Sequence, residues 1–133
     1  MKIPSLFAGV VLLGLGMVFD ACHKHDAVPE DEVVIEITSP QEGQSFRAGE
    51  EVPIRAKITS SGLLHGWAIE IRRSSDGKVL FAEDAHDHKK SFTLEKRWKS
   101  TPTERTDLTL EVFAQIDHGG KKTSKTLSFN VSP

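Results

Sequence analysis

Histidine is the residue type in this chain with the clearest capacity for chemistry. Four histidines fall in the stretch that has the pattern of a folded domain: His65, His86, His88 and His118. His86-Asp87-His88 is an H-x-H pair, which places two imidazoles on the same side of an extended segment, where they can chelate one ion. Neutral imidazoles together with a carboxylate, here Asp87, suit Zn²⁺, Cu²⁺ or Ni²⁺. The segment beyond residue 21 contains no methionine, which argues against a soft Cu(I) site.

The same histidines also fit a simpler interpretation, in which they are solvated residues of polar loops. The segment 84–90 (DAHDHKK) has the composition of an exposed loop, and its two lysines would repel a cation. A second H-x-H pair, His23 and His25, precedes the folded stretch, and we expect it to be incidental because ordering a tether costs entropy. A metal site and a set of solvated loop histidines therefore remain two open interpretations.

Strands rather than helices must position these side chains. Apolar residues recur with a period of two from Glu32 onward, and residues 33–133 contain no sustained apolar period of 3.6. Turn signals occur at Asp76-Gly77 and at Asp117-His118-Gly119-Gly120. The alternation predicts an all-β fold, a seven-stranded antiparallel sandwich with strands at about 33–37, 52–59, 63–73, 79–81, 92–94, 108–116 and 127–131. Phe46 fits a short additional strand.

The order of these strands predicts where the histidines lie. If the chain runs up and down through successive strands, the loops after the second, fourth and sixth strands all emerge at the same end, or pole, of the sandwich. His65 follows the first of these loops, His86 and His88 lie in the second, and His118 lies in the third. We therefore expect all four imidazoles at one pole, with acidic residues close by: Asp84, Asp87 and Asp117.

The predicted domain resembles the immunoglobulin-like modules of bacterial proteins. The resemblance is carried by Ile37-Thr38-Ser39-Pro40, followed by Gly43, Phe46 and Gly49, and by Trp67 on the third strand, where such sandwiches keep a core tryptophan. It covers most of residues 33–133. The resemblance implies an immunoglobulin-like fold and assigns no function.

The N-terminus carries the features of an export signal. Residues 6–19 are apolar or glycine, a run that is short for a bilayer span and typical of a signal peptide. Cys22, the only cysteine, follows directly after Ala21. This arrangement resembles a Bacteroidetes-type lipoprotein, which implies a signal peptide over 1–21, a covalent lipid on Cys22, a flexible tether to residue 32 and a domain over 33–133. A plain secretory signal and an uncleaved anchor are the alternatives.

Charge and motifs narrow the possible functions. The sequence has 17 basic and 19 acidic residues and no basic block, so we expect no nucleic-acid partner. No nucleophile motif or phosphate-binding glycine loop is present, so we expect no enzyme. The first hypothesis is a lipid-anchored, non-catalytic module at the outer membrane, periplasmic or surface-exposed, that contacts an envelope protein or a glycan. The alternative is a metal-binding lipoprotein that uses the histidines for Zn²⁺, Cu²⁺ or Ni²⁺.

Overall fold

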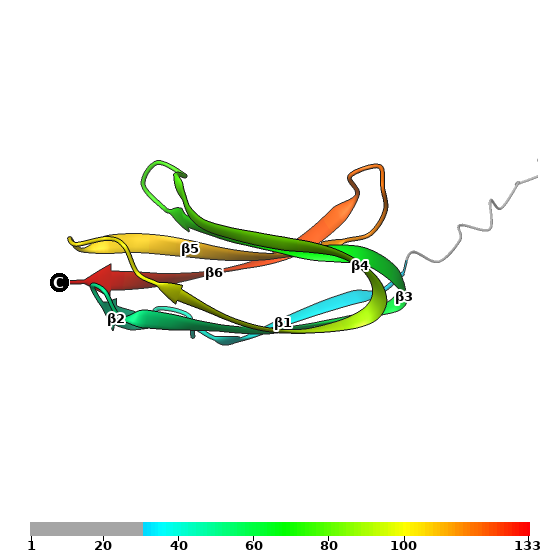
Figure 1. The fold of residues 1–133 in the computed structure, drawn as a ribbon, viewed down its shortest axis with the longest axis horizontal. Coiled ribbons are helices and arrows are strands. Elements are labelled where there is room, and N and C mark those ends of the chain that lie inside the picture. The colour runs from blue at the N-terminus through cyan, green and yellow to red at the C-terminus, as the bar shows by residue number, and fades with distance from the viewer. Residues whose placement is uncertain (1–30) are drawn as a thin grey trace, which may run out of the picture.

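The computed structural model describes residues 31–133, which form six β-strands (Figure 1). Cys22, the apolar run and the first histidine pair lie outside the described residues. No helix within residues 31–133 is long and apolar enough to cross a membrane. The strands are β1 (Val33–Ser39), β2 (Ser45–Arg47), β3 (Glu51–Arg73), β4 (Val79–Lys99), β5 (Thr106–Gln115) and β6 (Lys122–Ser132).

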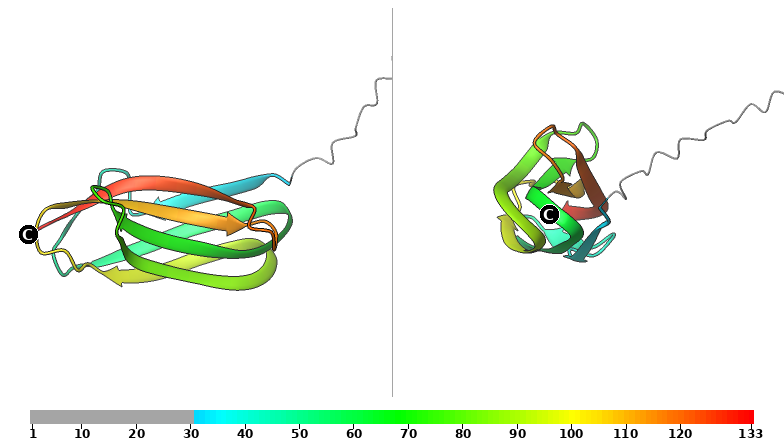
Figure 2. Two further views of the ribbon diagram at one scale, coloured as in Figure 1. Left: turned by 90° about the horizontal axis from the view of Figure 1, so that it is seen from above. Right: turned by 90° about the vertical axis from the view of Figure 1, so that its right-hand side faces the viewer.

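Two long, bent strands build both layers of the sandwich. The first half of β3, up to Ser60, pairs with β1 and with the second half of β4. The second half of β3, from Gly66, pairs with β5 and with the first half of β4. β6 continues this layer beside β5, and the short β2 adds to β6 in parallel. The all-β sandwich expected from the sequence is confirmed, with two layers formed by one hairpin that folds across both (Figure 2).

The strand count differs from the expectation of seven for a physical reason. Segments 60–62 and 84–90 were expected to be loops, but both belong to continuous strands. The pairing of β3 with β4 shifts register between Thr59 and Leu64 and again before Gly66, without ending. Such irregularities bend a strand while preserving its ladder, so the chain turns from one layer to the other without a loop. The pair His86 and His88 therefore lies on a strand.

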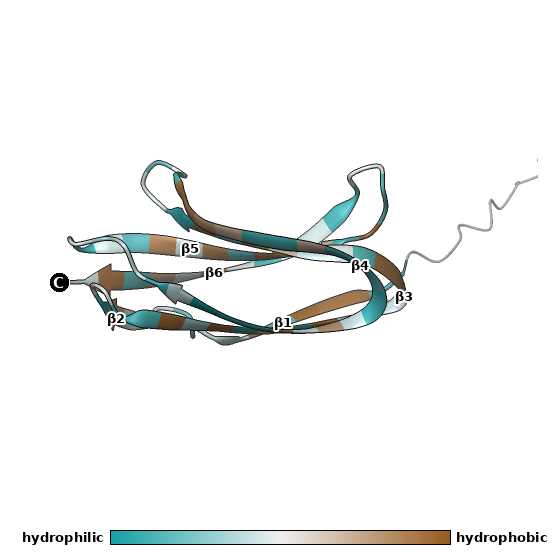
Figure 3. Ribbon diagram, viewed as in Figure 1, coloured by the Kyte–Doolittle hydropathy of each residue, from teal (hydrophilic) through white to brown (hydrophobic). Residues whose placement is uncertain are grey.

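The core lies between the layers and follows the alternation seen in the sequence (Figure 3). Trp67 is only 7% exposed, which confirms its predicted core position, and Trp98 is buried from the opposite layer. Removing this much apolar surface from water is the main stabilising contribution, at about 25 cal/mol per Å². The fully buried aliphatic side chains include Val52, Ile54, Ile58, Ile69, Ile71, Leu108, Leu110 and Val112.

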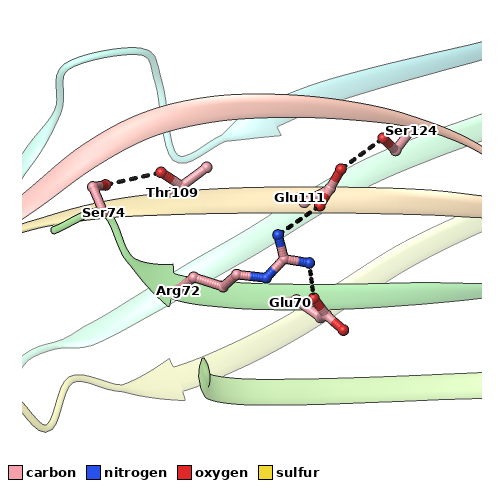
Figure 4. Close-up of polar contacts among 6 residues, drawn as sticks. All are labelled: Glu70, Arg72, Ser74, Thr109, Glu111 and Ser124. Atoms are coloured by element: carbon pink, nitrogen blue, oxygen red, sulfur yellow. Dashed lines mark hydrogen bonds and ion pairs between the residues drawn. The ribbon is translucent and has the colours of Figure 1, made fainter. Parts of the chain in front are cut away.

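A polar network ties together the outer faces of the strands that carry the candidate site (Figure 4). Arg72 on β3 donates to Glu70 on the same strand and lies 3.0 Å from a carboxylate oxygen of Glu111 on β5. Ser124 on β6 donates to the other oxygen of Glu111 at 2.7 Å. Three adjacent strands are thereby connected through one half-buried carboxylate, in addition to their backbone ladders.

The described chain begins at the pole where β3 and β4 bend. Val33 pairs with Ser60, and the Ser61 N–H donates to the carbonyl of Glu32 at 3.0 Å. The turn between β5 and β6 lies at this same end, whereas β2 and the C-terminus lie at the other (Figure 1). The bends, this turn and the start of β1 together define one pole of the sandwich.

Candidate metal centre

His65 is presented by the bend in β3. Leu64 is in register with Lys89, and Gly66 with His86, so one residue of β3 faces two residues of β4. This unequal count is a β-bulge on β4, which increases local twist and redirects side chains. His65 is the residue of β3 inside this bulge, and it is partly buried.

Gly66 allows the strands to approach closely next to His65. It pairs with His86 on β4 and with Gln115 on β5. A Cβ at this position would lie 2.2 Å from the carbonyl oxygen of Ala85 and 2.9 Å from the Gln115 side-chain oxygen. Any larger residue would force β4 away, so the absence of a side chain keeps His86 near His65.

His118 comes from the turn after β5. The carboxylate of Asp117 accepts a hydrogen bond from the Lys121 N–H at 2.9 Å, and the Ile116 N–H donates to the Lys121 carbonyl at 2.8 Å. These bonds close the turn, and Gly120 at φ +90° supplies its left-handed residue. The turn thus holds an exposed imidazole over the bend of β3.

The structure brings the four histidines expected at one pole into a single cluster. Ring centroids of His65 lie 4.1 Å from His118, 4.7 Å from His88 and 6.2 Å from His86. Ligand nitrogens of His65, His88 and His118 all lie within 4.8 Å of one another. The Nε2 atoms of His86 and His88 are 3.1 Å apart. Three elements far apart in the sequence therefore converge on a volume suited to one ion.

The electrostatics of the cluster favour the neutral form of the His65 imidazole. Partial burial lowers the pKa of His65, and the imidazoles of His118, His88 and His86 lower it further, whereas Asp117 opposes the shift. The Nδ1 atom of His65 is buried and has no hydrogen-bond partner among the described residues. Neutral imidazole nitrogens with available lone pairs are the form in which histidine binds metals.

Asp87, expected as a ligand, is not part of the cluster. Its carboxylate pairs with Lys89 at 2.9 Å, and both residues line a neighbouring cavity beside Trp67. Strand alternation explains the difference, because Asp87 lies between His86 and His88 on β4 and its side chain therefore points to the opposite face. The same ion pair engages one of the two lysines expected to repel a cation.

Asp117, expected nearby, is the carboxylate that accompanies the cluster. It lines a cavity of about 350 Å³ together with His65, His86 and His118. Gln115 and Lys122 also line this cavity, and the Lys122 ammonium lies 4.5 Å from the centre of the Phe113 ring. Sequence reasoning missed Gln115 and Gly66. An isolated glycine within a strand pattern is a recognised sign of close backbone approach, so Gly66 carried a usable signal.

No protein-family model matches the sequence, and no curated protein matches it. Among solved structures, the chain is similar to fibronectin(III)-like modules of Clostridium thermocellum CbhA, at 16% identity over 74% of this chain and 96% of that one, with a TM-score of 0.49. It is also similar to the CARDB domain of a Pyrococcus furiosus protein, at 11% identity over 77% and 95%, with a TM-score of 0.49. A crystal structure of that domain in complex with di-metal ions aligns at 9% identity over 77% and 96%, with a TM-score of 0.43.

Proposed function

We propose that this domain is a non-catalytic β-sandwich module that binds one divalent transition-metal ion. The ligands are His65, His88 and His118, and His86 lies beside them as the fourth nitrogen donor. The observation that carries the proposal is the convergence of four imidazoles from β3, β4 and the β5–β6 turn. Zn²⁺ and Cu²⁺ are the leading ions and Ni²⁺ is the third, because imidazole nitrogen suits all of them.

The cost of the cluster without an ion supports this function. Histidines on an ordinary polar surface repel one another when protonated and gain nothing from close packing. Here four rings lie with centroids no more than 6.2 Å apart, and the buried Nδ1 of His65 lacks a partner. A buried polar atom left unpaired destabilises the fold, because it has lost its hydrogen bonds to water without replacing them. A bound cation would engage the lone pairs of the neutral rings, including that of the unpartnered Nδ1 of His65.

The earlier hypothesis of a glycan-contacting face receives less support. Sugars are commonly stacked on exposed aromatic rings, and the two tryptophans here are 7% and 5% exposed. Contact with an envelope protein or a glycan remains a prediction, for which the described residues offer no specific feature.

Calorimetric titration of the purified chain with Zn²⁺ and Cu²⁺ tests the metal proposal. The expected result is one ion per chain with a dissociation constant of micromolar or tighter, lost in the double variant His86→Ala/His88→Ala. The matched control is Asp87→Asn, which removes a nearby charge outside the cluster and should bind as the unaltered chain does. No binding by the unaltered chain, or equal binding by the double variant, would overturn the proposal.

We further infer that the module is anchored by a lipid on Cys22 at the outer membrane of a bacterial envelope. Support comes from the sequence alone: an apolar run over residues 6–19, Ala21 and a single cysteine. Replacement of Cys22 by Ala should release the protein from isolated membranes into the soluble fraction. Unchanged membrane association would count against lipidation, and labelling with a radioactive fatty acid distinguishes a lipid from an uncleaved apolar anchor.

A further inference from the structure

The cavity lined by Asp117 borders the proposed ion. Three of the four clustered histidines line this cavity of about 350 Å³: His65, His86 and His118. A bound ion lies about 2.0–2.1 Å from each ligand nitrogen, so an ion held by these rings sits at the cavity wall. His88 is not among the residues that line the cavity, and it holds the ion from the other side. A space of this volume accommodates a small molecule next to the ion.

The cavity lies on one face of the sheet formed by β4, β3, β5 and β6. Gly66 on β3 pairs with His86 on β4 and with Gln115 on β5. Gln115 pairs in turn with Lys122 on β6. Paired residues of neighbouring strands project their side chains from the same face of a sheet. One row across the sheet therefore carries an imidazole, an amide and an ammonium group on the same face.

Gln115 and Lys122 are placed to contact a molecule in this cavity. The side-chain oxygen of Gln115 lies 2.9 Å from the position of a Cβ at Gly66, so the amide extends across β3 in the direction of β4. The Lys122 ammonium lies over the ring of Phe113, and among residues 31–133 it forms no ion pair with a carboxylate. The negative face of an aromatic ring attracts a cation and helps to hold it in place. The ammonium is thus positioned at the cavity and available to an anion.

A bound divalent ion makes this cavity cationic. Its two charges add to those of Lys121 and Lys122, whereas Asp117 is the only carboxylate among the described residues that line the cavity. One oxygen of that carboxylate already accepts a hydrogen bond from the Lys121 N–H at 2.9 Å. A cavity dominated by one sign of charge attracts ligands of the opposite sign. The balance of charge therefore favours a small anion.

The proposed ions accept a ligand beyond the four histidines. Zn²⁺ can expand from four ligands to five, and tetragonal Cu²⁺ sites have axial positions. Carboxylate oxygen is a regular ligand of Zn²⁺, at about 2.0–2.2 Å. His86 and His118 are exposed where they line the cavity, so an additional ligand can reach the ion from this side.

We propose that the metal-loaded cavity binds a small dicarboxylate. An oxygen of one carboxylate is the additional ligand to the ion, the other carboxylate pairs with Lys122, and the Gln115 amide donates a hydrogen bond to the bound anion. The inference rests on the proposed function, because the ion must be present for the first contact. It specifies what the module recognises, which is a divalent ion together with a small organic dianion.

The test is a calorimetric titration of the Zn²⁺-loaded full-length chain, purified in detergent, with malonate, succinate and glutarate. These probes differ in the length of the chain between their two carboxylates, and acetate is the monocarboxylate reference. The best dicarboxylate should bind at least about tenfold more tightly than acetate, because it makes a second charged contact. The chain stripped of metal should bind none of the probes in the same concentration range.

Two lysine variants separate the second contact from the first. Lys122→Met removes the ammonium and keeps most of the apolar stem, so this variant should still bind Zn²⁺ but should bind the best dicarboxylate no more tightly than acetate. Lys125→Met is the matched control, because Lys125 is exposed on the same strand and does not line the cavity. It should bind all probes as the unaltered chain does.

Visible absorption of the Cu²⁺ form gives a second readout, because a new oxygen ligand shifts the absorption band of the ion. The best dicarboxylate should shift this band in the unaltered chain while the ion stays with the protein on gel filtration. The inference is overturned if the ions bind but no dicarboxylate binds more tightly than acetate, if Lys122→Met binds as the unaltered chain does, or if the probes strip the ion; the metal site then still stands. If the chain binds none of the ions, the proposed function fails and the inference with it.

Discussion

The Nε2 atoms of His86 and His88 lie 3.1 Å apart, on alternate residues of one strand. Two imidazole nitrogens bound to one tetrahedral Zn²⁺, each about 2.0–2.1 Å from the ion, are separated by about 3.3 Å. The pair is therefore within a few tenths of an ångström of a chelating arrangement before any ion binds. Little rearrangement is required, and preorganisation of this kind favours affinity.

The two histidines of the pair should contribute unequally to binding. His88 belongs to the set of three nitrogens within 4.8 Å and also contacts His86. We expect His88→Ala to weaken Zn²⁺ binding about 100-fold and His86→Ala about tenfold, or roughly 2.7 and 1.4 kcal/mol. Calorimetry on each single variant measures both values. Equal losses would indicate a symmetrical four-ligand shell, and a larger loss for His86→Ala would contradict the assignment.

Acid should destabilise the metal-free domain through His65. Because its folded-state pKa lies below the ordinary value of 6.5, the unfolded chain binds the proton more tightly. Stability is therefore complete above pH 6.5 and is lost as the pH falls from there toward the lowered pKa. Urea denaturation with a chelator present, at a series of pH values from 8 to about 4.5, measures this slope. The variant His65→Gln should have a shallower slope below pH 6.5, and an identical slope would refute the role of His65.

Gly66 should tolerate no side chain. In Gly66→Ala the new methyl group would meet the Ala85 carbonyl at 2.2 Å, a backbone contact that only movement of β4 can relieve. The expected cost is about 1–3 kcal/mol of unfolding free energy, with weaker Zn²⁺ binding because His86 moves with its strand. Denaturant unfolding and metal titration measure the two effects.

The control for this prediction is Gly119→Ala in the turn that carries His118. A Cβ there would meet only the Asp117 side chain, at 3.4 Å, which is an ordinary contact. We expect a change within about 0.5 kcal/mol. If both glycine variants behave alike, steric exclusion at Gly66 is not the cause.

The network at Arg72 should stabilise the layer that carries the site. Arg72→Met leaves the half-buried carboxylate of Glu111 without a cation, and we expect a loss of about 1 kcal/mol. Arg97→Met is the matched control, because its pairing with Glu51 is long, at 3.6 Å, and both side chains are more than half exposed. Thermal and urea unfolding should show a decrease for the first variant and almost none for the second.

Much of the fold could be predicted from the alternation of apolar residues. The period of two identified strand segments and the burial of Trp67, because side chains of a strand point to opposite faces in turn. The turn-forming residues Asp76-Gly77 and 117–120 identified the two turns. The absence of an apolar period at 60–62 and 84–90 was interpreted as loops, and that interpretation was wrong. Backbone pairing continues through a bend even where the side-chain pattern is interrupted, so hydropathy alone cannot distinguish a bend from a loop.

The candidate site, like the fold, could be predicted only in part from the sequence. By itself, the sequence determined which residue types were available for a site. It also determined that four histidines would lie at one pole of the sandwich, because every second connection between strands of an up-and-down path emerges at the same end. These are His65, His86, His88 and His118. Only the tertiary structure decided that the rings touch, that Asp87 turns to Lys89 while Asp117 accompanies the cluster, and that β1 starts at the same pole. The approach of the rings depends on a one-residue bulge in β4, and the place where β1 starts depends on the pairing of Val33 with Ser60. Register is set by packing between strands distant in sequence, and a shift of one residue reverses which side chains face the site.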